Sequence, residues 1–241
     1  MAKKDLNFLC SAPIAHRGLH GLGVPENSLA AFGAAVAHGY IIELDVHLLS
    51  DGEIAVFHDD NLDRMCDALV EIESLTKPSI SKYRLANTRE HIPLLKDVLS
   101  LIDGAVPLII ELKGAGVGSK FVDALWGVLE DYCGEYALKS FNPLIVHNLR
   151  RRFRSAPVGQ LFSSSMFGDL PRLTGWMFRR VVYSSLRRCD FISVSYKDLN
   201  LPIIASLRRC GKLVLAWTIR SESARRSALK KSDNCICEKI I

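Results

Sequence analysis

The chain has 241 residues, 49% of them hydrophobic, which is enough to bury a large core. Its net charge of +5 is modest, and no linker, low-complexity tract or internal repeat divides it, so we expect one domain over residues 1–241. The opening segment Met1–Ser11 lacks the apolar core of a signal peptide, and no apolar run approaches the roughly 20 residues of a membrane span, so the expected compartment is the cytoplasm.

Apolar, strand-like runs alternate with helix-like segments along most of the chain. The first strand is expected at Pro13–His16, a helix with Asn27 as its cap at Asn27–His38, and the second strand at Tyr40–Val46. Eight strands with intervening helices predict an α/β fold, a parallel (β/α)₈ TIM barrel. The remaining strands are expected at Pro107–Leu112, Ala137–Phe141, Val158–Phe162, Phe191–Ser195, Leu213–Thr218 and Cys235–Cys237, and further helices at Ser119–Tyr132, Leu201–Arg209 and Glu222–Lys230.

One segment interrupts this alternation. Only twelve residues separate Asp45 from His58, and Asp51-Gly52 lies in the middle of them. A helical crossover does not fit easily in that length, whereas Asp-Gly is a strong hairpin signal. We therefore expect Val46–Asp59 to form a β-hairpin excursion after the second strand, which brings His58 over the barrel mouth.

Three carboxylates lie in the second and third strands, toward their carboxyl ends. Glu43 and Asp45 are two residues apart, so on a strand they share a face, and Glu111 ends the next strand. Active sites of such barrels lie at this end of the strands. Oxygen ligands without a Cys-x-x-Cys pair favour Mg²⁺ or Ca²⁺ over Zn²⁺, which predicts one divalent cation. The alternative is a salt-bridge cluster with Arg17 and Lys113.

Two histidines and two basic residues lie beside these acids. His16 ends the first strand and His58 follows the hairpin, so one could accept a proton from the nucleophile while the other protonates the leaving alkoxide. The planar guanidinium of Arg17 can bind a phosphate through two hydrogen bonds, and the ammonium of Lys113 adds a positive charge. Trp217, at the end of a later strand, either walls the substrate pocket or packs against the last helix. Together these residues predict metal-assisted cleavage of a phosphate ester.

An ordered set of short motifs resembles the glycerophosphodiester phosphodiesterase family. Each motif is weak alone, but their order along the chain is specific. A departure comes at the end, where the family tends to have Thr-Asp before Pro and this chain has Cys237-Glu238-Lys239. The motifs are His16-Arg17-Gly18, Pro25-Glu26-Asn27-Ser28, Glu43-Leu44-Asp45-Val46, Asp51-Gly52, His58-Asp59, Leu62-Asp63-Arg64 and Glu111-Leu112-Lys113, followed more weakly by Ser140-Phe141-Asn142 and Trp217-Thr218.

The resemblance implies a barrel that hydrolyses glycerophosphodiesters to glycerol 3-phosphate and an alcohol. It implies His16 and His58 as the general acid and base, and Arg17 and Lys113 as phosphate-binding residues. The metal ligands that it implies are Glu43, Asp45 and Glu111. Two alternatives stay open, a lysophospholipase D-type enzyme acting on lipid at a membrane surface and a barrel that binds phosphate ligands without turnover.

Arginine is concentrated in one part of the chain. The segment Arg150–Arg188 holds nine arginines, no lysine and a single acid, Asp169. If Asp169–Arg188 is helical, steps of about 100° per residue place arginines and aromatic residues on one face. Such a face suits peripheral contact with an anionic membrane, the alternative being a solvated basic helix, and no recognition motif supports a nucleic-acid partner. The face consists of Arg172, Trp176, Arg179, Arg180, Tyr183 and Arg187.

Overall fold

The computed structural model describes residues 4–114, 119–168 and 172–238, and it contains a closed barrel of eight parallel strands. The first strand pairs with both the second and the last, which closes the sheet. The predicted (β/α)₈ barrel is therefore confirmed. The barrel strands are β1 Ile14–His16, β2 Ile41–Leu48, β4 Leu108–Leu112, β5 Tyr136–Ser140, β6 Val158–Phe162, β7 Phe191–Ser195, β8 Leu213–Ile219 and β9 Asn234–Cys237.

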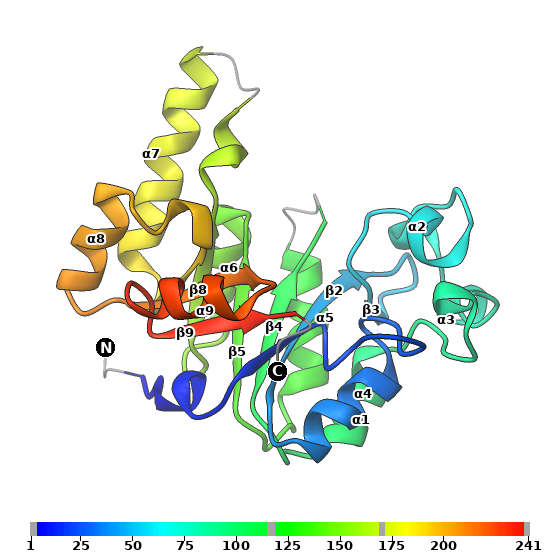
Figure 1. The fold of residues 1–241 in the computed structure, drawn as a ribbon. Helices are drawn as coiled ribbons and strands as arrows, with labels where there is room; N and C mark the ends of the chain where they lie inside the picture. Colours follow the sequence, from blue (N-terminus) through cyan, green and yellow to red (C-terminus); the bar gives the residue numbers. More distant parts are fainter. Residues whose placement is uncertain (1–3, 115–118, 169–171, 239–241) are drawn as a thin grey trace.

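Helices connect the strands around the outside of the barrel (Figure 1). The first helix begins at Leu29, and its N-cap is Ser28, whose hydroxyl accepts a hydrogen bond from Ala31 N at 3.1 Å. The expectation that Asn27 caps this helix was wrong, because that side chain turns toward the barrel mouth. The helices are α1 Leu29–Ala37, α4 Leu95–Ile102, α5 Ser119–Leu129, α6 Pro143–Arg152, α7 Arg172–Arg188, α8 Pro202–Arg209 and α9 Glu222–Leu229.

Side-chain alternation along the strands separates two environments. In β2, Ile42 and Leu44 pack in the core cluster that includes the surrounding helices, whereas Ile41 belongs to a second cluster inside the barrel. Successive residues of a strand point to opposite faces, so Glu43 and Asp45 face inward above Ile41. The barrel interior thus has an apolar lower layer and a charged upper layer.

The lower layer is sealed by the N-terminal segment. The 3₁₀-helix η1, Asn7–Cys10, buries Phe8 and Leu9 against the inward residues of the strands. The Asn234 side chain at the start of β9 donates hydrogen bonds to Leu9 O at 2.9 Å and Ala12 O at 2.8 Å. These contacts close the floor, so any polar opening must lie at the other end.

The expected hairpin forms between the end of β2 and the strand that follows it. Strand β3, Ile54–Val56, pairs antiparallel with β2, and Val46 lies opposite Val56. Gly52 adopts a φ of +87° in the turn, a conformation that glycine adopts readily. The chain then runs through a small core of its own before α4, and His58 lies at its start. The short helices of this excursion are α2 Asp63–Cys66, η2 Ile72–Ser74, α3 Lys77–Ile80 and η3 Leu85–Asn87; two more 3₁₀-helices, η4 Ser164–Phe167 and η5 Tyr196–Asp198, lie elsewhere.

None of the helices in the described part of the chain is both long and apolar enough to cross a bilayer.

The packing of the floor generates a stability prediction. A Cβ added at Gly159 in β6 would lie 2.4 Å from the ring of Phe191, which is fully buried. We expect Gly159→Ala to lower the free energy of unfolding by about 1–3 kcal/mol through overpacking, measured by urea denaturation. The double variant Gly159→Ala/Phe191→Leu should recover part of the loss, and an unchanged stability of the single variant would contradict this packing.

Candidate active site

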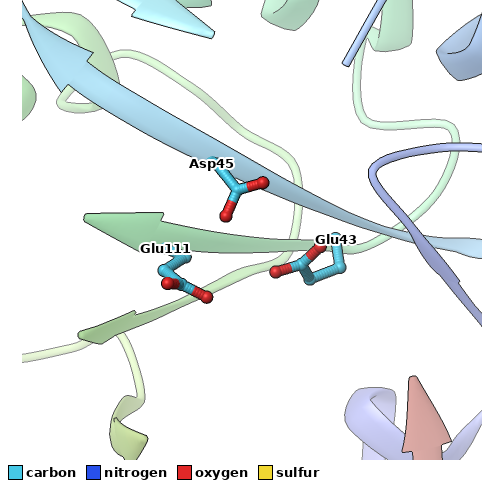
Figure 2. Close-up of side chains that lie close together, drawn as sticks. All are labelled: Glu43, Asp45 and Glu111. Atoms are coloured by element: carbon cyan, nitrogen blue, oxygen red, sulfur yellow. The ribbon is translucent and has the colours of Figure 1, made fainter. Parts of the chain in front are cut away.

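Three carboxylates converge at the upper end of the barrel (Figure 2). Glu43 and Asp45 come from β2 and Glu111 from β4, and the strand register pairs Asp45 with Glu111. All three side chains are buried, and each offers a ligand oxygen within 4.8 Å of the others. Like charges this close repel one another in a buried site, so the cluster requires nearby positive charge.

Three basic side chains supply that charge. Arg17 Nε lies 3.2 Å from Asp45 Oδ2, and Lys113 Nζ lies 3.2 Å from Asp45 Oδ1 and 2.6 Å from Glu111 Oε1. Lys139, from β5, lies 2.8 Å from Glu43 Oε1 and 3.2 Å from Glu111 Oε2. Sequence reasoning missed Lys139, although its place two residues after the inward-facing Ala137 was a usable signal.

The electrostatic balance favours ionised acids. Burial alone would raise the pKa of Asp45, but Lys113 and then Arg17 outweigh it and hold this pKa well below its ordinary value. Burial also opposes ionisation of Glu111, whose pKa Lys113 and Lys139 nevertheless lower. In return, the neighbouring acids raise the pKa of Lys139 above its ordinary value despite complete burial. These pKa directions favour the charged forms of Asp45, Glu111 and Lys139.

The donor set fits a hard divalent cation. It consists of three carboxylates and no sulfur, which is the chemistry that Mg²⁺ and Ca²⁺ prefer. Glu43 Oε1 and Glu111 Oε1 lie at ion-pair distance from lysine ammonium groups but accept no hydrogen bond of normal geometry. Both of these oxygens thus retain capacity for another cation. The alternative of a salt-bridge cluster involves the same acids. The observed geometry is therefore compatible with both a metal site and a salt-bridge cluster.

Each of the two candidate acid–base histidines has a carboxylate partner. His16 Nδ1 lies 3.8 Å from Glu238 Oε2, and His58 Nδ1 lies 2.6 Å from Asp59 Oδ1. Arg64 Nε in turn contacts Asp59 Oδ2 at 2.6 Å. The Asp59 carboxylate on Nδ1 fixes the orientation of the His58 ring and leaves its Nε2 available for proton transfer. His16 Nδ1 is close to Glu238 but makes no hydrogen bond with it.

A small cavity joins these groups. It measures about 70 Å³, and most of the predicted site residues line it. Trp217 belongs to its wall and packs edge-to-face against Phe141, with ring centroids 5.6 Å apart. Of the residues predicted from sequence, the cavity is lined by His16, Arg17, Asp45, His58, Glu111, Lys113 and Trp217; it adds Lys139, Phe141, Leu161 and Thr218.

Asn27 belongs to this site rather than to the helix start. Its side-chain amide donates to Asp45 Oδ2 at 3.0 Å, and its Oδ1 accepts from Asp45 N at 3.5 Å. The residue is buried and adopts a φ of +52°, which asparagine tolerates better than most residues. It therefore fixes the orientation of the Asp45 carboxylate.

The contacts of Glu238 generate a pH prediction. His16 lowers the pKa of Glu238, partial burial opposes this, and Arg220 adds to the lowering, which brings it to about 2 from an ordinary 4.5. A carboxylate whose pKa is lower in the folded protein stabilises the fold above the ordinary value, and this contribution is lost as pH falls to the folded value.

We therefore expect Glu238→Gln to lose less stability than the unmodified chain between pH 4.5 and about 2, measured by urea unfolding across that window. Glu71→Gln, at an exposed position, is the control. If the stability of the Glu238 variant and of the unmodified chain depended on pH in the same way, the contact between Glu238 and His16 would be contradicted.

Comparison with known proteins identifies relatives that match almost the whole length of this chain. Residues 16–237 match the model of the glycerophosphoryl diester phosphodiesterase family. The YhdW protein of Bacillus subtilis is 32% identical over 219 residues, which cover 87% of this chain and 86% of that one. The glycerophosphodiester phosphodiesterase of Caldanaerobacter subterraneus is 30% identical over 243 residues, covering 93% of each chain.

Solved structures resemble the fold as well. A phosphodiesterase from Oleispira antarctica, determined in complex with the product sn-glycerol-3-phosphate, superposes with a TM-score of 0.79 at 24% identity, over 95% of this chain and 93% of that one. The matched residues include the three clustered carboxylates, the two histidines and the three basic residues of the site. This chain belongs to the glycerophosphoryl diester phosphodiesterase family.

Proposed function

We propose that this chain is an enzyme that hydrolyses glycerophosphodiesters to glycerol 3-phosphate and an alcohol, with residues 1–241 acting as one catalytic domain. The observation that carries the proposal is a polar cavity lined by two histidines and bordered by three buried carboxylates. Family membership and a relative named as a glycerophosphodiester phosphodiesterase support the same reaction. We place the activity in the cytoplasm, where disulfides are rare, because all seven cysteines are free.

In the proposed reaction, His16 and His58 divide the proton transfers. One accepts the proton of the attacking hydroxyl or water, and the other donates a proton to the leaving alkoxide. Asp59 orients the His58 ring through Nδ1, and the Glu238 carboxylate lies 3.8 Å from Nδ1 of His16.

Charge balance supports a role for one divalent cation, Mg²⁺ or Ca²⁺. The three acids are matched by the three basic residues Arg17, Lys113 and Lys139, so the cluster alone is formally neutral. A neutral cluster attracts a phosphodiester anion weakly. A bound divalent cation would make the site positive and stabilise charge on the phosphoryl oxygens. Glu43, Asp45 and Glu111 would hold it, while Arg17 and Lys113 bind the phosphate.

The activity and its metal dependence are tested together. We expect purified protein to release glycerol 3-phosphate from glycerophosphodiesters with Mg²⁺ or Ca²⁺ and to lose this activity in EDTA. Glu43→Gln should lower the rate on the order of 100-fold or more while keeping the fold, because one charged ligand is lost without loss of volume.

Glu53→Gln, on the hairpin and paired with Lys96, is the matched control and should retain full activity. Full activity in EDTA would argue against the metal, and binding of the diester without any turnover would favour a barrel that only binds phosphate ligands.

A second candidate function is lysophospholipase D-type hydrolysis at an anionic membrane, and helix α7 favours it. This helix stands out beyond the barrel strands (Figure 1). Trp176 and Met177 are 56% exposed and Val181 is 45% exposed, while Arg179 and Arg180 beside them are also exposed. Apolar and basic side chains on one exposed helix suit anionic lipid headgroups.

The helix differs in part from its sequence prediction. Tyr183 was expected on the basic face, but its ring packs beside Phe162 and Phe167 at centroid distances of 6.4 and 6.2 Å. Arg180 stacks over Trp176 at 4.8 Å, which keeps the basic and aromatic groups together. The side chain of Arg172 lies outside the described residues.

Vesicle binding tests this candidate. We expect binding to vesicles rich in phosphatidylserine, weak binding to phosphatidylcholine vesicles, and loss of binding as salt is raised, because the attraction is electrostatic. Trp176→Ala/Arg179→Ala/Arg180→Ala should abolish the binding in a sedimentation assay without changing hydrolysis of a water-soluble diester. Equal binding to both vesicle types would contradict an anionic surface.

A further inference from the structure

One lysine inside the barrel has no task in the proposed reaction. Lys139 projects from β5 into the charged layer, and only 2% of its side chain is exposed. Its ammonium group lies between Glu43 Oε1 at 2.8 Å and Glu111 Oε2 at 3.2 Å. A lysine is rarely buried unless it is paired, and here both partners are members of the acidic triad.

Lys139 is more deeply buried than the two other basic residues of the site. Arg17 also contacts Glu26, and the side chains of Arg17 and Lys113 are more exposed, at 14% and 16%. Lys139 makes ion pairs with Glu43 and Glu111 alone among the described residues. Its charge therefore acts almost entirely on these two acids.

The same two acids are proposed metal ligands. A divalent cation held by the triad would lie within a few ångströms of the Lys139 ammonium, and the two cations would repel one another across a buried site. In the absence of metal, the ammonium offsets the repulsion between Glu43 and Glu111. Lys139 thus stabilises the metal-free cluster and disfavours the metal-bound one.

We propose that Lys139 is an internal cation that sets the affinity of the acidic triad for its divalent metal. It keeps the acids paired when no metal is bound and makes the bound metal exchangeable rather than permanent. This inference rests on the proposed function, since it takes the triad to be a metal site. It makes Lys139 a positioning residue that acts through Glu43 and Glu111.

The test is metal binding by Lys139→Met, measured by calorimetry with Mg²⁺ and with Ca²⁺. Methionine removes the charge, preserves the length and offers no oxygen ligand. We expect the variant to bind metal roughly tenfold more tightly or better, because a unit charge a few ångströms from the ion is removed. The rise in melting temperature on adding metal should also exceed that of the unmodified protein.

Lys96→Met is the matched control, since it removes a lysine from an ion pair with Glu53 outside the site. It should bind metal like the unmodified protein. Equal or weaker metal binding by Lys139→Met would overturn the inference. So would a fall in melting temperature that is the same with and without metal, because a purely structural lysine would behave in this way.

Folding of the variant gives a second readout. Lys139→Gln keeps a hydrogen-bond donor and serves if the methionine variant fails to fold. If both variants fold only when metal is added, metal replaces the missing charge and the inference is supported. If neither folds even in saturating metal, it is overturned.

Hydrolysis by the unmodified protein, assayed in parallel, separates this inference from the proposed function. Unmodified protein that hydrolyses the diester while Lys139→Met gains no affinity leaves the function standing and overturns the inference. Absent hydrolysis combined with tighter metal binding by the variant does the opposite.

Discussion

Three negative charges in the interior of a barrel constrain the rest of this structure. Glu43, Asp45 and Glu111 are buried and close together, and isolated ionised carboxylates are too poorly solvated to persist in such a place. Three basic side chains from three separate parts of the chain neutralise them, and each lies at ion-pair distance from at least one of the acids. The loop after β1 and the strands β2, β4 and β5 meet around the barrel mouth. Their arrangement keeps the acidic and basic side chains paired.

The same matching extends beyond the barrel into the excursion after β2. Arg17 and Arg64 both contact Glu26 Oε1 at 2.6 Å, and Arg64 also contacts Asp59, the partner of His58. A continuous chain of charged contacts thus links the loop after β1 to the hairpin region. His58 is held in place from outside the barrel, although its imidazole lines the cavity within it.

The features that follow from local periodicity were predictable from the sequence. The spacing of Glu43 and Asp45, with the Asp51-Gly52 turn, determines which side chains face the mouth and where the chain turns back. Lys139 was not found, because a single lysine in a short apolar run resembles an exposed strand residue. Asn27 was assigned to a helix start because asparagine serves equally as a cap, and only the fold shows that Asp45 lies beside it. The small core after β3 depends on contacts among short segments that have no periodic signal of their own.

The closure of the barrel affects the order in which its strands can pair during synthesis. β1 gains its partner β2 early in synthesis, but its other edge is completed only by β9, near the end of the described chain. The carbonyl oxygens of Leu9 and Ala12 likewise lack their hydrogen-bond donor until Asn234 has been synthesised. Until the ribosome has released this last strand, two parallel edges lie open, and open edges recruit strands from other molecules. The seam between β1 and β9 is therefore the last strand pairing of the barrel that synthesis makes possible.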